Sequence, residues 1–442
     1  MGLFDARAPR YTSYPPANHF AGGVGPATVA GWLEAVPAGT RVSLYVHIPY
    51  CRRLCWFCAC RTQGTQTDRP LIPYLTQIKA ELALVGRHLS PDVEVAAIHL
   101  GGGTPTILPA GMLSDLCGTL KAFRPLAPDL AFSVEIDPTE VDEDRLRALG
   151  AAGMTRASIG VQDFDPAVQD AIGRSQPYEL TRDVVAMIRD TGVTSLNMDM
   201  LFGLPHQTRG RMAASVQKVL SLSPDRLALY GYAHVPWMAK RQVLIDSTAL
   251  PNSEERLDLF EVAARMFAWD GYKEIGIDHF ARPGDPLALA AREGRMRRNF
   301  QGYTEDGCDV LIGLGASAIS RTPQGYAQNA STSSAYAQAV KKGRLATERG
   351  HLLSADDLLR ADMIERLMCR FELDLPEIAQ AHDVPLDLLL RMTAPLRHRF
   401  ADWIEAKGGT IRLSRSPRLI ARLAAQEVDA YAMPEGRHSR AL

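Results

Sequence analysis

The chain contains 442 residues, which is enough for one large domain and a smaller one. Its 49 basic and 50 acidic side chains give a net charge of −1, so no overall field attracts nucleic acid or a membrane surface. No apolar run approaches the roughly 18 residues of a membrane-spanning helix. We therefore expect a cytoplasmic protein that binds neither nucleic acid nor membrane.

The N-terminal segment, residues 1–40, is rich in proline, glycine and tyrosine and has no apolar periodicity. Two interpretations are open: an arm that covers the active site, or a poorly ordered tail. In both cases it is distinct from the domain that follows.

From residue 41 onward, apolar runs that predict buried strands alternate with amphipathic stretches that predict helices. Six such repeats predict an α/β fold with a parallel sheet and helices outside it. A curled, incomplete (β/α)6 barrel fits this pattern, and its ligands should bind at the C-terminal ends of the strands. The predicted strands are Val42–Ile48, Val93–Leu100, Leu130–Ile136, Arg156–Val161, Ser195–Phe202 and Arg226–Tyr232.

Helix-capping patterns mark the last third of the chain. Asn252 and Glu255 form a predicted capping box that opens a helix through Trp269. Ser354 and Asp357 predict another helix start. We place a domain boundary near residue 350, which gives a catalytic domain at 41–350 and a mainly helical C-terminal domain at 351–442.

Cys51, Cys55 and Cys58, spaced C-x3-C-x2-C, directly follow the first predicted strand. Cysteine thiolates are the usual protein ligands of iron–sulfur clusters. A [4Fe–4S] cluster has four irons, so three thiolates leave one iron open to a small molecule. Structural zinc is the alternative, but it takes four ligands, usually from two separated pairs, and no second pair occurs. The pattern favours a cluster and leaves Cys60 without an assigned role.

The run CRRLCWFC at residues 51–58 carries an aromatic residue before its third cysteine and resembles the radical S-adenosylmethionine enzymes. The longer string from Tyr45 to Cys60 resembles one family among them, the oxygen-independent coproporphyrinogen III oxidases or coproporphyrinogen dehydrogenases. The resemblance implies a TIM-like barrel, a [4Fe–4S] cluster on the three cysteines, and S-adenosylmethionine on the open iron.

Two further motifs follow predicted strands. The run GGGTP at residues 101–105 alone indicates only a tight turn, and it does not fit the dinucleotide fingerprint. In the resemblance it matches the motif that holds the amino group of S-adenosylmethionine. A lone glutamate such as Glu135 is usually a solvated acid, but Glu135 matches the family's E-x-D-P motif.

The resemblance also implies two bound S-adenosylmethionine molecules, one on the cluster and one beside it. Position by position, the residues expected at the first are Tyr45, Gly102, Glu135 and Ile319. Those expected at the second are Phe57, Gly103, Thr104, Gln162, Arg174, Asp199 and Ala233.

The segment RNFQGY at residues 298–303 resembles a segment that marks this family. Related haem chaperones carry H-N-x-x-Y-W there, and that motif is broken here, which favours the oxidase. Guanidinium groups bind carboxylates in bidentate geometry, so the nearby arginines are candidates for binding the substrate's propionates. The alternative is that this charge run forms a solvated helix face. The candidate substrate residues are Arg292, Arg298, Phe300 and Gln301.

The implied reaction is oxidative decarboxylation of two propionates of coproporphyrinogen III to vinyl groups by a 5′-deoxyadenosyl radical, giving protoporphyrinogen IX. No side chain is expected to act as an acid or base. The resemblance implies a reducing partner such as flavodoxin or ferredoxin, and we expect a monomer. The alternatives are a haem chaperone and a radical enzyme of the same fold that methylates or opens a porphyrin ring.

Overall fold

The computed structural model describes residues 8–431. Residues 1–7 of the predicted arm and residues 432–442 of the predicted C-terminal domain lie outside the described part. The largest element is a 12-stranded sheet. All six predicted strands form and pair in parallel with their neighbours in chain order. They are β1 (Arg41–Ile48), β4 (Glu94–Gly102), β5 (Leu126–Ile136), β6 (Arg156–Gln162), β7 (Ser195–Phe202) and β8 (Arg226–Gly231).

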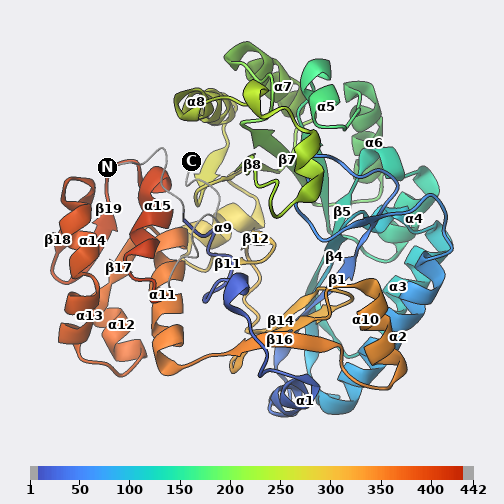
Figure 1. The fold of residues 1–442 in the computed structure, drawn as a ribbon, viewed down its shortest axis with the longest axis horizontal. Helices are drawn as coiled ribbons and strands as arrows, with labels where there is room; N and C mark the ends of the chain where they lie inside the picture. Colours follow the sequence, from blue (N-terminus) through green and yellow to red (C-terminus); the bar gives the residue numbers. More distant parts are fainter. Residues whose placement is uncertain (1–7, 432–442) are drawn as a thin grey trace.

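Helices connect these strands and form an arc along the outer face of the sheet (Figure 1). In α2, Leu75, Ile78, Leu82 and Val85 are buried because their spacing of three or four residues puts them on one face. The predicted capping box of Asn252 and Glu255 is present at the start of α8. The helices of the arc are α2 (Leu71–His88), α3 (Ala110–Lys121), α4 (Glu143–Ala151), α5 (Pro166–Ala171), α6 (Tyr178–Asp190), α7 (Arg209–Ser221) and α8 (Ser253–Trp269).

The sheet does not close into a full barrel. Beyond β1 lie the parallel strand β13 and three antiparallel strands, and beyond β8 lie two antiparallel strands, so the first and last strands of the sheet remain apart. The added strands are β9 (Lys273–Ile275), β10 (His279–Ala281), β13 (Val310–Leu314), β14 (Ile319–Thr322), β15 (Gly325–Asn329) and β16 (Thr347–Leu352). Helices α9 (Pro286–Arg292) and α10 (Ser333–Lys341) and the hairpin β11 (Arg297–Asn299) and β12 (Gly302–Thr304) complete this part.

The C-terminal part lies on the open side of the arc (Figure 1). Its helices are α11 (Ala355–Cys369), α12 (Leu375–Ala381), α13 (Leu386–Met392), α14 (Ala394–Arg399) and α15 (Pro417–Gln426). The predicted cap of Ser354 and Asp357 is present at α11. The expectation of a mainly helical domain did not include the small antiparallel sheet of β17 (Glu372–Asp374), β18 (Ile404–Lys407) and β19 (Thr410–Leu413). Strands of three or four residues are too short to give a clear alternation of apolar and polar residues.

From residue 8 onward the N-terminal segment is packed against the rest of the chain. Tyr11 and Tyr14 are buried in the core of the C-terminal part, and the Tyr11 hydroxyl donates to Asp429 at 2.9 Å. The helix α1 (Pro26–Glu34) buries Trp32 and Leu33 in the core of the large sheet. The segment thus joins the two parts of the chain. No helix within residues 8–431 is long and apolar enough to cross a membrane.

Candidate functional site

The cysteine loop begins where β1 ends. Cys51 closes the short strand β2 (Tyr50–Cys51), which pairs in parallel with β3 (Gln63–Gly64) and so fixes both ends of the loop. Cys51, Cys55 and Cys58 all line one cavity of about 470 Å³. Cys51 Sγ accepts a hydrogen bond from Thr104 Oγ1 at 3.5 Å, and Cys55 Sγ accepts one from Arg174 Nη1 at 3.4 Å. The three predicted ligands therefore face a shared space.

The protonation of these thiols follows from their surroundings. Burial raises the pKa of Cys51 to about 11. A hydrogen bond with the Cys60 thiol and the charges of Arg241 and Arg174 lower the pKa of Cys58 to about 6, although burial opposes this shift. Cys60, whose role the sequence left open, therefore contacts the third cysteine of the motif.

The three cysteines fit a cluster better than a single metal ion. No group of three or more His, Cys, Asp or Glu side chains within residues 8–431 could hold one ion, so the structure gives no support to the zinc alternative. In a [4Fe–4S] cluster each thiolate binds a different iron, so the sulfurs must border one space without converging on one point. A cavity bordered by all three meets that requirement.

The glycine turn packs directly against the cysteine loop. Gly102 has φ +115°, and a Cβ on it would lie 2.7 Å from the His47 ring. A Cβ on Gly103 would lie 2.7 Å from the carbonyl oxygen of Tyr50 and 3.0 Å from Cys51 Sγ. Only glycine tolerates such a conformation and such an approach. The turn therefore presents bare backbone to the cavity beside the cysteines.

Glu135 lies at the cavity wall near the end of β5. Its Oε2 accepts from the backbone N–H of Gly102 at 3.0 Å, and its Oε1 lies 3.2 Å from His99 Nε2. Burial opposes ionisation, but the hydrogen bond and charge of His99 outweigh it and lower the pKa of Glu135. The carboxylate is therefore ionised and can accept hydrogen bonds from an ammonium or a ribose hydroxyl.

Polar side chains from the next two strands continue this wall. Gln162, at the end of β6, has φ +66° and lines the cavity. Arg174 is buried, donates to Asp137 Oδ2 at 3.0 Å and donates to the carbonyl oxygen of Gly160 at 2.8 Å. Asp199 on β7 accepts from Asn197 Nδ2 at 2.8 Å, and burial raises its pKa to about 6. Gln162 and Asp199 come from neighbouring parallel strands and Arg174 comes from the loop between α5 and α6, and all three line the same cavity.

Phe57 lines the cavity, but three predicted cofactor residues are not among its lining residues. Tyr45 donates to or accepts from His47 Nδ1 at 2.9 Å. The carbonyl oxygen of Ala233 accepts from Gln242 Nε2 at 3.1 Å, and the same amide donates to the Phe57 carbonyl at 2.8 Å. Ile319 opens β14, next to Gly313. These three predicted residues are therefore not brought to the cavity wall.

The candidate substrate residues separate in the structure. Arg298, Phe300 and Gln301 line the cavity. Arg292 is exposed at the end of α9 and is absent from the cavity walls. The charge run that contains both arginines thus includes a solvated residue and a buried one.

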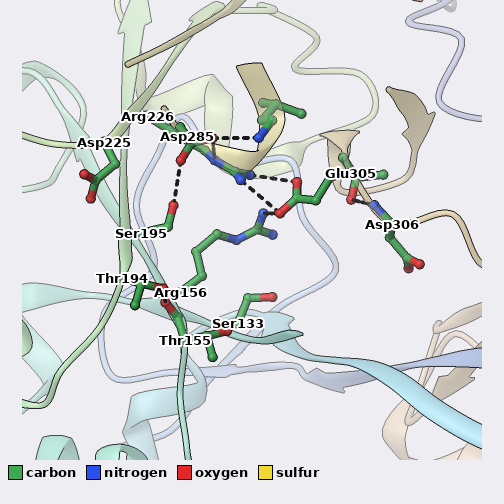
Figure 2. Close-up of polar contacts among 12 residues, drawn as sticks. Ser133, Thr155, Arg156, Thr194, Ser195, Asp225, Arg226, Asp285, Glu305 and Asp306 are labelled. Atoms are coloured by element: carbon green, nitrogen blue, oxygen red, sulfur yellow. Dashed lines mark hydrogen bonds and ion pairs between the residues drawn. The ribbon is translucent and has the colours of Figure 1, made fainter. Parts of the chain in front are cut away.

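The cavity reaches a buried ion-pair network that the sequence analysis missed (Figure 2). Arg226 donates to Asp285 Oδ1 at 2.5 Å and to both carboxylate oxygens of Glu305 at 3.0 and 2.9 Å. Arg156 Nη1 lies 3.6 Å from Glu305 Oε1, and Ser195 donates to Asp285 at 3.0 Å. Arg156 and Arg226 are the first residues of β6 and β8, so the cavity extends from the C-terminal to the N-terminal ends of the strands.

Comparison with known proteins agrees with this geometry. Residues 45–219 match the Radical SAM superfamily. The chain is 54% identical to an oxygen-independent coproporphyrinogen III oxidase of Paracoccus denitrificans over 442 residues, covering 100% of this chain and 98% of that relative. It is 39% identical to one of Pseudomonas aeruginosa, covering 97% and 94% of the two chains. The structure of the coproporphyrinogen III oxidase of Escherichia coli, described as a radical SAM enzyme, matches with TM-score 0.92 and 36% identity over 96% of this chain and 98% of that one. The predicted fold class and family resemblance are confirmed.

Proposed function

This chain belongs to the oxygen-independent coproporphyrinogen III oxidases of the radical SAM superfamily, and on that basis we propose that it converts two propionates of coproporphyrinogen III to vinyl groups. The product is protoporphyrinogen IX. The observation that carries the proposal is the full-length similarity to oxidases, at 54% identity, of a chain whose three cysteines border one cavity.

The chain uses a [4Fe–4S] cluster and S-adenosylmethionine, as its family does. When bound, these groups supply one-electron chemistry that can remove a hydrogen atom from an unactivated carbon. Cys51, Cys55 and Cys58 would hold the cluster. Thr104 and Arg174, which donate to Cys51 and Cys55, would stabilise negative charge on the sulfurs.

Glu135 and the bare backbone of Gly102 and Gly103 would hold the ammonium and ribose of S-adenosylmethionine next to the cysteines. Gln162, Arg174 and Asp199, on the adjoining wall, would hold the second molecule that the family resemblance implies. Geometry supports this assignment because all six residues line one cavity, and five of them lie on or directly after the consecutive strands β4 to β7.

The reaction needs no acid or base from the protein. Each propionate loses one hydrogen atom from its β-carbon, then CO2 and one electron that passes to an electron acceptor, and the remaining two carbons form the vinyl group. The chain's own tasks are therefore to orient the tetrapyrrole, exclude water and keep the reactive carbon near the cofactor. Phe300 and Gln301 on the cavity wall would contact the tetrapyrrole, and Arg298 would contact a propionate.

An electron donor must reach the cluster, and we place its docking surface on the loop after β8. Trp237, Met238, Val243 and Leu244 are exposed there. Between them, Gln242 donates to the Phe57 carbonyl inside the cysteine loop at 2.8 Å. The neighbouring side chain of Lys240 is also exposed. An apolar surface beside an exposed lysine suits an acidic one-electron carrier such as flavodoxin or ferredoxin.

Two finer properties belong to the same proposal. All seven cysteines are free, which suits a reducing compartment such as the cytoplasm. We also propose that the protein acts as a monomer.

The decisive experiment is anaerobic. The reconstituted protein is incubated with coproporphyrinogen III, S-adenosylmethionine and a reductant, and CO2, 5′-deoxyadenosine and tetrapyrrole mass are measured. We expect stepwise mass losses that correspond to two decarboxylations. Haem binding without CO2 would instead indicate a chaperone, and a mass gain of methyl groups or an opened ring would indicate a different radical enzyme.

A further inference from the structure

A side pocket of about 80 Å³ adjoins the main cavity. It shares Arg10, Tyr230, Asp278 and Arg298 with the cavity walls. Arg422, from α15, also lines it, so the barrel, the N-terminal arm and the C-terminal part all contribute. None of its lining residues comes from the cysteine loop or the glycine turn. A group in this pocket therefore lies apart from the place where the cofactor would react.

The walls of the side pocket carry five arginines and one carboxylate, that of Asp278, and one of the five, Arg418, is already paired with Glu274 outside the pocket. Asp278 already has two partners: His279 Nδ1 lies 2.7 Å from Oδ1, and Arg298 Nη2 lies 3.9 Å from Oδ2. Burial and the charges of Arg10 and Arg298 lower the pKa of Arg422 to about 9. Positive charges that repel one another in a buried space favour the binding of an anion.

One donor in the pocket wall has no acceptor. Arg298 Nη1 is buried and has no hydrogen-bond partner in the described part of the chain. Arg298 Nε donates to the carbonyl oxygen of Arg10 at 3.2 Å, and the guanidinium lies over the Tyr303 ring, 4.3 Å from its centroid. The Arg298 side chain is thus held in place while its Nη1 group makes no hydrogen bond within residues 8–431. Because a buried donor without a partner is costly, a ligand oxygen that reaches Nη1 would satisfy it.

The rest of the pocket wall is apolar and includes Phe202, Phe260 and Leu419. A volume of about 80 Å³ cannot hold a tetrapyrrole ring, but it can hold a short arm. An arm of two methylene groups that ends in a carboxylate matches apolar walls combined with guanidinium groups.

We propose that the side pocket binds the carboxylate of a substrate propionate other than the one being decarboxylated, and thereby fixes the orientation of the tetrapyrrole. This inference rests on the proposed function, because coproporphyrinogen III carries four propionates. It gives Arg10 and Arg422 a role in substrate binding that the sequence did not predict. The N-terminal arm and the C-terminal part then help to select the substrate.

The test uses the full-length, cluster-containing protein and coproporphyrin III, the oxidised and fluorescent form of the substrate, as the probe. Fluorescence titration gives the Kd of wild type, Arg298→Gln, Arg298→Lys and Arg422→Gln. Arg292→Gln is the matched control because Arg292 is exposed and lines neither space. We expect the Arg298→Gln and Arg422→Gln variants to bind about tenfold or more weakly, Arg298→Lys to be intermediate, and the control to match wild type. S-adenosylmethionine binding should stay unchanged in Arg422→Gln.

Each other outcome has a definite meaning. Unchanged coproporphyrin III affinity in the folded Arg298→Gln variant overturns the proposal, even when wild type turns over. If Arg422→Gln loses S-adenosylmethionine binding, the pocket binds the carboxylate of the methionine part of that cofactor. This result also overturns the proposal. Thermal melts identify a variant that does not fold. In that case the coproporphyrin III affinity of whichever Arg298 variant does fold decides between the outcomes. Weak binding by the pocket variants together with no CO2 release by wild type supports the pocket and contradicts the proposed function.

Discussion

The Glu135 carboxylate accepts a hydrogen bond from the backbone N–H of Gly102 at 3.0 Å, which links the ends of two adjacent strands. The link joins two motifs that stand 33 residues apart in the chain. It leaves the rest of the Glu135 carboxylate on the cavity wall, beside the bare backbone of the turn. This hydrogen bond therefore holds the glycine turn in place and also orients the Glu135 carboxylate.

Replacing Glu135 by Gln should weaken S-adenosylmethionine binding about tenfold or more, because the side chain loses its charge and its NH2 group must face either the Gly102 N–H or His99 Nε2. Equilibrium dialysis with labelled S-adenosylmethionine on the cluster-containing protein measures this. Glu143→Gln, at an exposed position of α4, is the control. If Glu135→Gln binds S-adenosylmethionine with wild-type affinity, Glu135 does not belong to the proposed cofactor site.

Replacing Gly102 by Ala should destabilise the protein by about 1–3 kcal/mol, because φ is +115° and the new Cβ would clash with the His47 ring. Denaturant unfolding of the two proteins gives the difference. Gly118→Ala is the matched control: Gly118 lies within α3, a Cβ there meets nothing within 4 Å, and helix propensity predicts a gain of about 0.5–1 kcal/mol. Equal stability of Gly102→Ala and wild type would contradict the geometry of the turn.

The sequence predicted the six strands and the strand-end residues because both signals are local. An apolar run identifies a strand, and a polar residue at its C-terminal end identifies a candidate ligand. Cys51 was found by the spacing of the three cysteines, and Glu135 was assigned through the family resemblance. The identity of the cofactor and substrate came from the family resemblance, which the full-length relatives confirm.

The residues of the side pocket, and those that line the cavity at the N-terminal ends of the strands, gave no such local signal in the sequence. Arg156 and Arg226 open their strands, where a charged residue normally marks the surface, and only the paired sheet places them inside. Arg422 donates to the carbonyl oxygen of Pro9 at 3.0 Å, a contact across 413 residues that no local pattern predicts. Arg292 and Arg298 looked alike in sequence, and the hairpin of β11 and β12 separates them by burying one.

Replacing Cys55 by Ser should remove most of the bound iron and sulfide after reconstitution, because a serine oxygen is a poor substitute for the thiolate that iron–sulfur clusters require. Iron and sulfide analysis per chain measures the loss. Cys117→Ser is the control, since Cys117 is buried in α3 and lines no part of the cavity. A full complement of iron in Cys55→Ser would contradict the assignment of the ligands.

Replacing Lys240 by Glu should raise the KM for an acidic electron carrier several-fold at low ionic strength, because the substitution reverses one charge on the proposed docking surface. The effect should fade as salt screens the charges. Steady-state reduction with flavodoxin measures it, and turnover with a small chemical reductant should be unchanged. Lys407→Glu, on the C-terminal sheet, is the matched control and should leave the KM unaffected. Equal KM values for both variants would place the donor elsewhere.

Glu81 should make the protein less stable as the pH rises through neutrality. Burial raises its pKa to about 7, although its carboxylate accepts from the Gly315 backbone N–H at 2.7 Å and from the Tyr336 hydroxyl at 2.8 Å. The folded protein then binds this proton more tightly than the unfolded chain, whose glutamate pKa is about 4.3. The contribution is therefore complete below the unfolded pKa and is lost as the pH rises through about 7, a change of about 3–4 kcal/mol.

The Glu81→Gln variant tests this because a neutral amide has no titration over the same range. Denaturant unfolding at a series of pH values between about 4.5 and 8 should show a decline in wild type that is absent, or much smaller, in the variant. Glu94→Gln, a substitution at a half-exposed carboxylate at the start of β4, should keep the wild-type slope. If Glu81→Gln also keeps that slope, another buried group causes the decline.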